Sequence, residues 1–343
     1  MGKIIKMKPN IFEIATKELN QDAFITWLLQ FANPNCNQYD EYLNKCGIEF
    51  VTELIKKQVP EFNEKIKTIK AGRQWDNIDV WAEVNDEYLV IIEDKTNTSH
   101  HSDQLGRYKK YASEWCVKNN YKEPICIYLK TGNEAQSSLN EIVKQGFAIF
   151  NRKHFIDLLV KYNNTENDIF KDFYSRLVRI EKSHNEFEDK KIGKWKSEDW
   201  EGFYQFLEKE IDLVSWNFVN NPNGGFWNAV LNWNYWGIYP AYLQIEQGNL
   251  CFKISTDPDE LNMPEDITRS EIRNKLHNLI IKKGKEFSMK GIKRPDRFGH
   301  GKYMTVAIVE KKIWLGSNEE TLNKEKVTGT LKNYRKFLKE IIK

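Results

Sequence analysis

Residues 88–95, YLVIIEDK, place three charged side chains directly after a run that is almost wholly apolar. A short apolar run of this kind is typical of a buried β-strand. A buried charge is costly unless it is paired or binds a metal ion. Side chains alternate between the two faces of a strand, so Glu93 and Lys95 are expected on one face and Asp94 on the other. Any fold of this chain must therefore supply partners for the charges at this strand end.

A further carboxylate is expected close to the same strand end. Asp79 lies near the start of an expected strand at residues 78–84, and residues 85–87 (NDE) are typical of a tight turn. A hairpin of this form brings Asp79 and Glu93 together. Paired carboxylates are hard oxygen ligands that suit Mg²⁺ or Mn²⁺, and a lysine beside them stabilises charge on a phosphorane-like transition state. A Glu-x-Lys alone is a common pattern, but this combination predicts a metal-dependent phosphodiesterase.

The surrounding segments predict an α/β arrangement in the first half of the chain. Amphipathic patterns favour a helix at residues 16–31, with Thr16 or Asn20 as its N-cap, and a second helix at residues 39–57. A weak strand is expected at residues 66–70, ahead of the hairpin. The remaining expected elements are a helix at 103–118, strands at 124–129 and 146–150, and helices at 151–162 and 169–181.

A polar, lysine-rich stretch at residues 183–198 separates two expected domains, residues 1–185 and 195–343. Six of the eleven tryptophans lie between residues 195 and 236, and their spacing along expected elements favours core packing over base stacking. The second domain is predicted to be α+β. Its expected strands are 227–236, 241–246, 250–255 and 303–309, with a further candidate at 312–315, and its expected helices are 270–285 and 324–342.

Charge is unevenly spread along the chain. The net charge is only +3, yet residues 261–343 contain 20 Lys and Arg against 10 Asp and Glu. A basic segment can attract phosphate groups, and a solvated lysine-rich surface explains the same composition equally well. The charge alone therefore leaves both interpretations open.

Cysteine usage and hydropathy indicate a cytoplasmic protein. The five cysteines are odd in number, scattered and without a C-x-x-C pair, which predicts reduced thiols and neither a zinc site nor a disulfide framework. No run of eighteen apolar residues occurs, and the first ten residues lack the apolar region of a signal peptide.

The order of these motifs resembles the PD-(D/E)xK nuclease superfamily, the restriction-endonuclease-like fold. The resemblance rests on a helix, a strand with Asp79, a strand with Glu93 and Lys95, and a helix that opens with Gln104-x-x-x-Tyr108. It covers residues 16 to about 150 and implies an αβββαβ core with a mixed central sheet. It further implies that Asp79 and Glu93 bind the metal, that Lys95 is the catalytic lysine and that Gln104 lies at the edge of the site. The chain departs from the family pattern in having no proline before Asp79.

The resemblance also implies an extra metal ligand on the N-terminal helix. Glu18 is the candidate, and Asp22, one turn further on, is the alternative. The backbone carbonyl of Asp94 is another candidate ligand. The implied activity is hydrolysis of phosphodiester bonds, in DNA by preference, with water activated by Mg²⁺ or Mn²⁺ as the nucleophile.

Several residues outside this set are candidates for nucleic-acid contact. They are Arg73, Tyr108, Lys293, Arg294 and Arg297. The second domain is expected to bind substrate or a partner, and a homodimer or a partner protein from a bacterial or phage defence system is a further expectation. His100 and His101 are expected to be solvated. The alternative function is a catalytically silent nucleic-acid-binding or protein-interaction module on the same fold.

Overall fold

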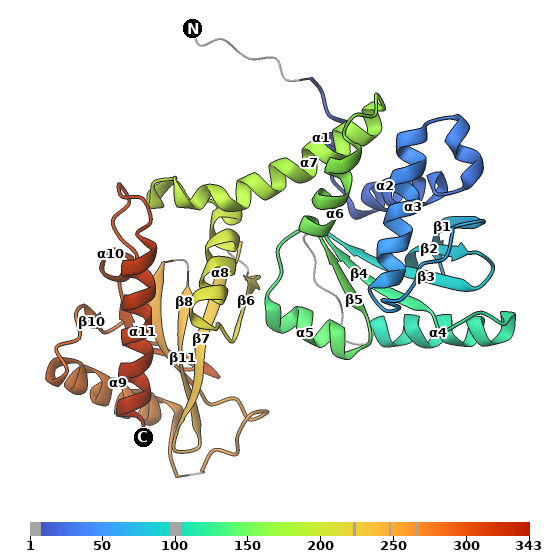
Figure 1. The fold of residues 1–343 in the computed structure, drawn as a ribbon. Helices are drawn as coiled ribbons and strands as arrows, with labels where there is room; N and C mark the ends of the chain where they lie inside the picture. The colour runs from blue at the N-terminus through green and yellow to red at the C-terminus, as the bar shows by residue number, and fades with distance from the viewer. Residues whose placement is uncertain (1–7, 97–103, 222–223, 247, 265) are drawn as a thin grey trace, which may run out of the picture. The chain divides into compact units, whose positions relative to one another are not determined.

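The computed structural model describes residues 8–96, 104–221, 224–246, 248–264 and 266–343 (Figure 1). The chain forms two compact units. The N-terminal unit comprises Met1–Glu134 and Ser138–Lys182, and the C-terminal unit comprises Ala135–Ser137 and Ser183–Lys343. In the part of the chain that is described, no helix has the length and apolar character needed to cross a membrane.

The N-terminal unit is built on a five-stranded mixed sheet with the order β1-β2-β3-β4-β5. The first three strands form an antiparallel meander, and β3, β4 and β5 run parallel. The strands are β1 (Ile69–Trp75), β2 (Ile78–Val84), β3 (Tyr88–Lys95), β4 (Ile125–Lys130) and β5 (Ala148–Asn151). The helices are α1 (Ile11–Ile14), α2 (Glu18–Phe31), α3 (Glu41–Lys56), α4 (Gln104–Asn119), α5 (Gln136–Lys144), α6 (Arg152–Leu159) and α7 (Asp168–Asn185).

Short turns fix the register of the meander. Asp76 and Asn77 join β1 to β2 with φ angles of 50° and 69°, and Trp75 pairs directly with Ile78. Asn85 and Asp86, between β2 and β3, have φ angles of 56° and 55°. Asn and Asp tolerate this left-handed region better than most residues do, so the sequence suits the tight connections that align the three strands.

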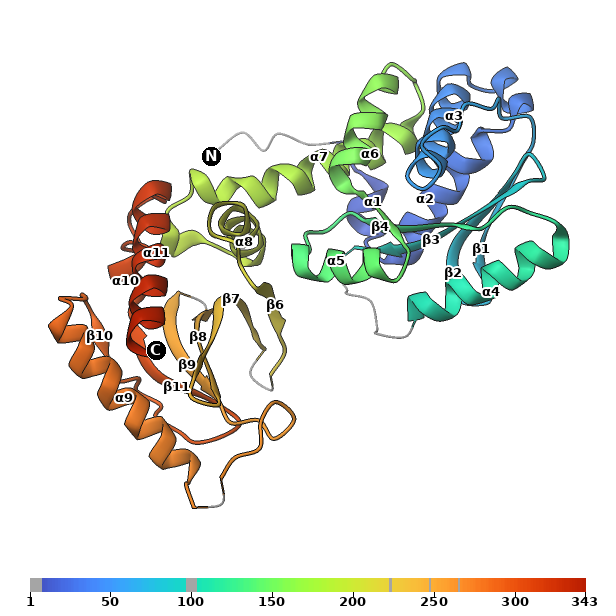
Figure 2. The same ribbon diagram turned by 60° about the horizontal axis from the view of Figure 1, so that its bottom comes forward.

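Helices cover both faces of this sheet, α2 and α3 on one side and α4 on the other (Figures 1 and 2). The side chains of β3 alternate accordingly. Val90 and Ile92 join the core beneath α2 and α3, whereas Leu89 and Ile91 pack with Leu105 of α4. The strand therefore has two buried faces, and this explains why its sequence is a nearly continuous apolar run.

The C-terminal unit has a six-stranded antiparallel sheet with the order β10-β11-β9-β8-β7-β6. Residues of α8, α9 and α11 form a single core with one face of it. Trp216 and Tyr204 are buried in this core, as the predicted packing role of the aromatic block requires. The elements are α8 (Ser197–Ile211), β6 (Ser215–Val219), β7 (Phe226–Trp236), β8 (Tyr239–Glu246), β9 (Asn249–Ser255), α9 (Arg269–Glu286), β10 (Ile292–Lys293), β11 (Tyr303–Val309), α10 (Lys311–Trp314) and α11 (Lys324–Ile341).

Some sequence predictions about local structure are wrong. Helix α2 begins at Glu18 and has Lys17 at its N-cap position without a side-chain cap, rather than Thr16 or Asn20. The candidate strand at residues 312–315 is instead helical: residues 312–314 belong to α10 and Leu315 is its C-cap, and the buried Trp314 donates to the carbonyl of Gly248. Helices α5 and α8 and strands β6 and β10 were not expected. The predicted fold class, a mixed α/β core followed by an α+β unit, is confirmed.

Helices α2 and α3 cross in close contact at Gly47. A Cβ atom at this position would lie 2.6 Å from the carbonyl oxygen of Leu28 and 2.7 Å from the amide nitrogen of Ala32. Both atoms belong to the backbone of α2 and its end, so neither can rotate away. The glycine thus sets how closely α3 approaches the helix that carries Glu18 and Asp22.

We predict that Gly47→Ala destabilises the N-terminal unit by about 1–3 kcal/mol, because overpacking forces the two helices apart. Urea unfolding followed by circular dichroism measures the change. Gly106→Ala is the matched control: its Cβ would meet nothing within 4 Å, and alanine favours helix over glycine by up to about 1 kcal/mol. Equal destabilisation by both substitutions would contradict the packing argument.

Candidate active site

The site forms where β2 and β3 stop pairing. Their ladder runs from Val84↔Tyr88 to Val80↔Ile92. Strand β3 then continues for three more residues, Glu93 to Lys95, paired only in parallel with β4. In place of a ladder bond, the Oδ2 atom of Asp79 accepts the backbone N–H of Asp94 at 3.0 Å. The Asp79 carboxylate is thereby fixed against the end of β3.

Lys95 connects the two carboxylates of this strand end. Its Nζ atom lies 2.5 Å from Oε1 of Glu93 and 3.5 Å from Oδ2 of Asp79, and it donates to the carbonyl of Asp94 at 3.1 Å. The exposed fractions of the Glu93, Lys95 and Asp79 side chains are 1%, 11% and 20%. The predicted shared face of Glu93 and Lys95 is therefore present, and solvent reaches the site mainly from the Asp79 side.

Burial perturbs these groups strongly. Desolvation raises the pKa of the Glu93 carboxyl, and the charge of Asp79 raises it further, while Lys95 opposes both. Burial alone would lower the pKa of Lys95, but its pairs with Glu93 and Asp79 outweigh that effect and raise it. The other oxygen of Glu93, Oε2, is buried without a hydrogen-bond partner in the described structure. The site thus concentrates negative charge that a single lysine balances only in part.

Helix α4 contributes the predicted Gln-x-x-x-Tyr pair. The Nε2 atom of Gln104 donates to Oε1 of Glu93 at 2.9 Å and to the hydroxyl of Tyr108 at 2.7 Å. Burial raises the pKa of Tyr108, although Gln104 opposes the shift. Gln104 therefore orients the carboxylate from the side opposite α2.

Asp94 faces the other side of the sheet, as alternation requires. Its Oδ1 atom accepts from Nε2 of Gln21 at 2.6 Å, and Oε1 of Gln21 accepts from the hydroxyl of Thr131 at 2.9 Å. Burial raises the pKa of Asp94 well above its usual range, and the charge of Asp22 adds to this. Gln21 and Thr131 were not expected at the site. The sequence signal that could have identified Gln21 is its position four residues before Ile25, on the same, buried side of the helix.

Glu18 and Asp22 both lie near the strand end, in different places. Oε1 of Glu18 accepts the backbone N–H of Thr96 at 2.9 Å, just beyond Lys95, and its charge contributes to the raised pKa of that lysine. Asp22 is buried beside Asp94, and desolvation followed by the Asp79 charge raises its pKa to about 6. Glu18 is thus on the Lys95 side, and Asp22 belongs to the Asp94 side.

Of the remaining sequence candidates, Arg73 lies close enough to the site for its charge to oppose the raised pKa of Asp22, and the other three lie in the C-terminal unit. Arg73 is exposed on β1 and donates to the carbonyl of Leu19 at 2.9 Å. In the C-terminal unit, Lys293 pairs with Glu310, the guanidinium of Arg294 lies 4.2 Å from the ring centre of Phe298, and Arg297 is exposed. These three residues belong to a different compact unit from the carboxylates. His100 and His101 lie outside the described residues.

The donor set at the strand end is compatible with a divalent cation. Within the described ranges, no cluster of three or more His, Cys, Asp or Glu side chains is arranged to hold a metal ion. Mg²⁺, however, is commonly bound by one or two carboxylates together with waters and substrate phosphates. Asp79 is part-exposed, and Glu93 has a buried oxygen without a partner. These two carboxylates fit the hard, oxygen-coordinated ions that the sequence predicts.

We predict that Gln21→Ala lowers the free energy of unfolding by about 1–3 kcal/mol, because it leaves Asp94 and Thr131 buried without their partner. Urea unfolding provides the measurement. Gln30→Ala on the same helix removes an exposed bond to the carbonyl of Ala71 and should change stability little. A Gln21 effect no larger than that of Gln30 would refute the buried-network interpretation.

Comparison with protein families identifies a match that covers the elements of the site. The model of the PD-(D/E)XK nuclease superfamily matches residues 9–211, from α1 to the end of α8. Comparisons with curated proteins and with solved structures gave no match. The family match extends over more than half of the 343 residues and includes the Asp79, Glu93 and Lys95 strands. The chain therefore belongs to the PD-(D/E)XK nuclease superfamily.

Proposed function

We propose that this protein is a metal-dependent nuclease that hydrolyses phosphodiester bonds at the Asp79–Glu93–Lys95 site. The observation that carries the proposal is the single ammonium of Lys95 held between two carboxylates at the open end of the β2–β3 ladder. Membership of the nuclease superfamily supports the reaction class. Strongly perturbed pKa values cluster at functional sites, and the raised pKa values of Glu93 and Lys95 add support to the proposal.

Each residue has a distinct role in the proposal. Asp79 and Glu93 are the residues that would hold the cation, with Glu18 as the candidate for an additional carboxylate. When bound, a divalent cation supplies polarisation of the phosphate and a lowered pKa for the attacking water. Lys95 donates hydrogen bonds to the phosphate oxygens or to the water, which stabilises charge in the transition state. Gln104 holds Glu93 in orientation and keeps Tyr108 at the edge of the site.

Asp94 has a positioning role in this mechanism. The Asp94 carboxylate bonds to Gln21 on α2, so its side chain is directed away from the Glu93 and Lys95 face. Its backbone contributes instead, through the N–H bound by Asp79 and the carbonyl bound by Lys95. The backbone N–H and carbonyl of Asp94 thus link the Asp79 and Lys95 side chains to one strand.

The substrate and setting are proposed from family resemblance. DNA is the proposed substrate, the cytoplasm the proposed location and defence against phages the proposed role. One site cleaves one strand, so cutting both strands of a duplex would call for two copies of the chain. A partner protein from the same defence system is the alternative assembly.

We predict that the wild-type protein nicks supercoiled plasmid DNA with Mg²⁺ or Mn²⁺, and that Asp79→Asn and Lys95→Ala each reduce the rate by at least about 100-fold. Gel electrophoresis of the plasmid forms gives the rates. Lys67→Ala, an exposed lysine of the same unit, is the control and should retain full activity. Cleavage that is unchanged in the Asp79 and Lys95 variants would overturn the assignment of this site. Absence of cleavage by the wild type with either metal would favour the catalytically silent binding module.

Binding of the cation itself provides a separate test. Saturating Mg²⁺ or Mn²⁺ should raise the melting temperature of the wild type, since a ligand present at 100 times its Kd stabilises by about 2.7 kcal/mol. The shift should disappear in Asp79→Asn and Glu93→Gln and persist in Lys67→Ala. Differential scanning fluorimetry measures it without reference to turnover. An equal shift in all four proteins would place the cation elsewhere.

A further inference from the structure

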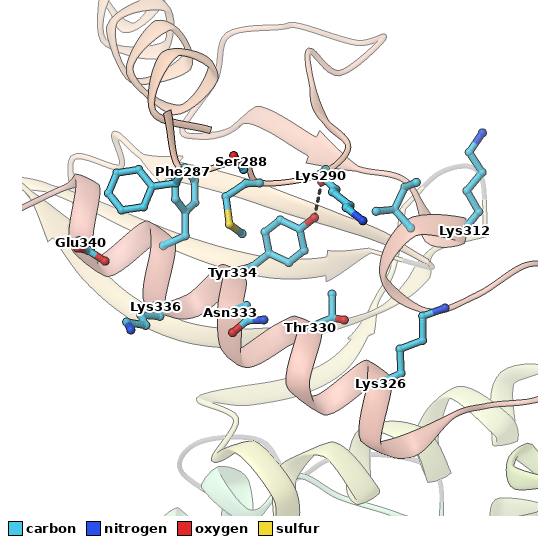
Figure 3. A pocket seen from close by; sticks show the side chains of 13 residues that line it. Phe287, Ser288, Lys290, Lys312, Lys326, Thr330, Asn333, Tyr334, Lys336 and Glu340 are labelled. Atoms are coloured by element: carbon cyan, nitrogen blue, oxygen red, sulfur yellow. Dashed lines mark hydrogen bonds between the residues drawn. The ribbon is translucent and has the colours of Figure 1, made fainter. Parts of the chain in front are cut away.

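The C-terminal unit contains a pocket of about 810 Å³ along α11 (Figure 3). One wall is a stripe of α11 from Lys326 to Glu340, a length of about 20 Å at 1.5 Å per residue. The opposite wall is the segment after α9, from Phe287 to Lys290, together with Lys312 and Ile313 of α10. The walls are joined where the hydroxyl of Tyr334 donates to the carbonyl of Lys290 (Figure 3).

The floor of the pocket is aromatic and apolar. Tyr334 and Phe337 are buried at its base, and Met289 and Ile313 are partly exposed. Phe287 is 44% exposed on the rim, and the centres of its ring and of the Phe337 ring lie 5.9 Å apart in a T-shaped arrangement. An aromatic ring left this accessible beside an apolar floor offers a stacking surface to a flat ligand.

The rim of the pocket is cationic. Lys290, Lys312, Lys326 and Lys336 are exposed around it, against the single carboxylate of Glu340. Lys312 lies 3.2 Å from Glu310. The other three lysines have no carboxylate within ion-pair distance among the residues that the structure describes. The pocket therefore has an excess of positive charge that a polyanion would neutralise.

These features narrow the chemistry of an occupant. Four cations distributed over a groove of this length suit several phosphates in a row rather than one compact anion. Single-stranded nucleic acid binds to proteins through a basic groove along its backbone and through aromatic side chains against which its bases stack. In a duplex the bases are already stacked with one another, so they would not reach the floor.

We propose that this pocket binds single-stranded nucleic acid, with its phosphates at the lysine rim and a base against Phe287 and the apolar floor. The proposal deepens the proposed function, on which it rests, because it gives the C-terminal unit a share in substrate capture. The two claims separate experimentally, since binding is measurable without cleavage.

The test is fluorescence anisotropy of a labelled single-stranded DNA 20-mer with the full-length protein in EDTA, which prevents turnover. Lys326→Ala/Lys336→Ala is compared with Lys332→Ala/Lys339→Ala. The second pair comes from the same helix and has the same charge change, and both of its lysines are exposed but do not line the pocket. We expect at least a fivefold weaker Kd for the first pair and less than a twofold change for the second. The slope of log K against log salt concentration should become shallower by about 0.7 for each phosphate that the first variant no longer neutralises.

Additional experiments test the role of the aromatic ring of Phe287 and the kind of ligand that binds. Phe287→Ala should weaken binding of the 20-mer at least threefold. Equal losses of affinity in the two double variants would show that DNA responds to the overall surface charge of the helix and not to the pocket, and would overturn the proposal. If a duplex 20-mer binds more tightly and loses as much affinity in the Lys326→Ala/Lys336→Ala variant, the ligand is a duplex and the proposal is overturned. If micromolar AMP or ATP displaces the 20-mer, the ligand is a free nucleotide and the proposal is likewise overturned. Failure of plasmid cleavage alone would leave this binding result intact and would count only against the nuclease proposal.

Discussion

The separation of β2 from β3 is the constraint on which the rest of the site depends. If the ladder continued past Val80↔Ile92, backbone bonds would occupy the end of β3 and Asp79 would be one more strand residue. Instead the Asp79 carboxylate binds the N–H of Asp94, and the ladder opens at the point where Glu93 and Lys95 need space. The parallel pairing with β4 keeps β3 straight beyond that point, so an open edge and a rigid support occur together.

The two layers of helices hold adjacent residues of one strand from opposite sides. Gln104 of α4 binds Glu93, and Gln21 of α2 binds Asp94. Glutamine is suited to holding these carboxylates in place, because its amide donates a hydrogen bond without adding a charge. The negative charge of the site is thus left for Lys95 and for a cation to balance.

The sequence was most informative where burial and charge coincide. The apolar run before Glu93, the turn residues Asn85 and Asp86 and the spacing of Gln104 and Tyr108 were sufficient to predict the β2–β3 hairpin and its following helix. The partners of Asp94 could not be predicted, because Gln21 and Thr131 meet only through tertiary packing across 110 positions of chain. Helix α5 was missed because only Ile142 of its nine residues is buried. Helix α8 was missed although its buried residues form an apolar stripe, because it starts at the end of the stretch assigned to the domain boundary and no element was assigned to the residues that follow.

The tight turns of the β1–β2–β3 meander have a consequence for the order in which the chain folds. Contacts between residues close in sequence form with little loss of loop entropy, and distant contacts form more slowly. Asp79 and Asp94 are only 15 positions apart, whereas the pairing of Lys95 with Lys130 in β4 must wait for all of α4. We therefore expect a newly synthesised chain to align its two carboxylates early and to acquire the rigid backing of the lysine last. The acidic side chains of the site would then be close together before the pairing of β3 with β4 fixes their geometry.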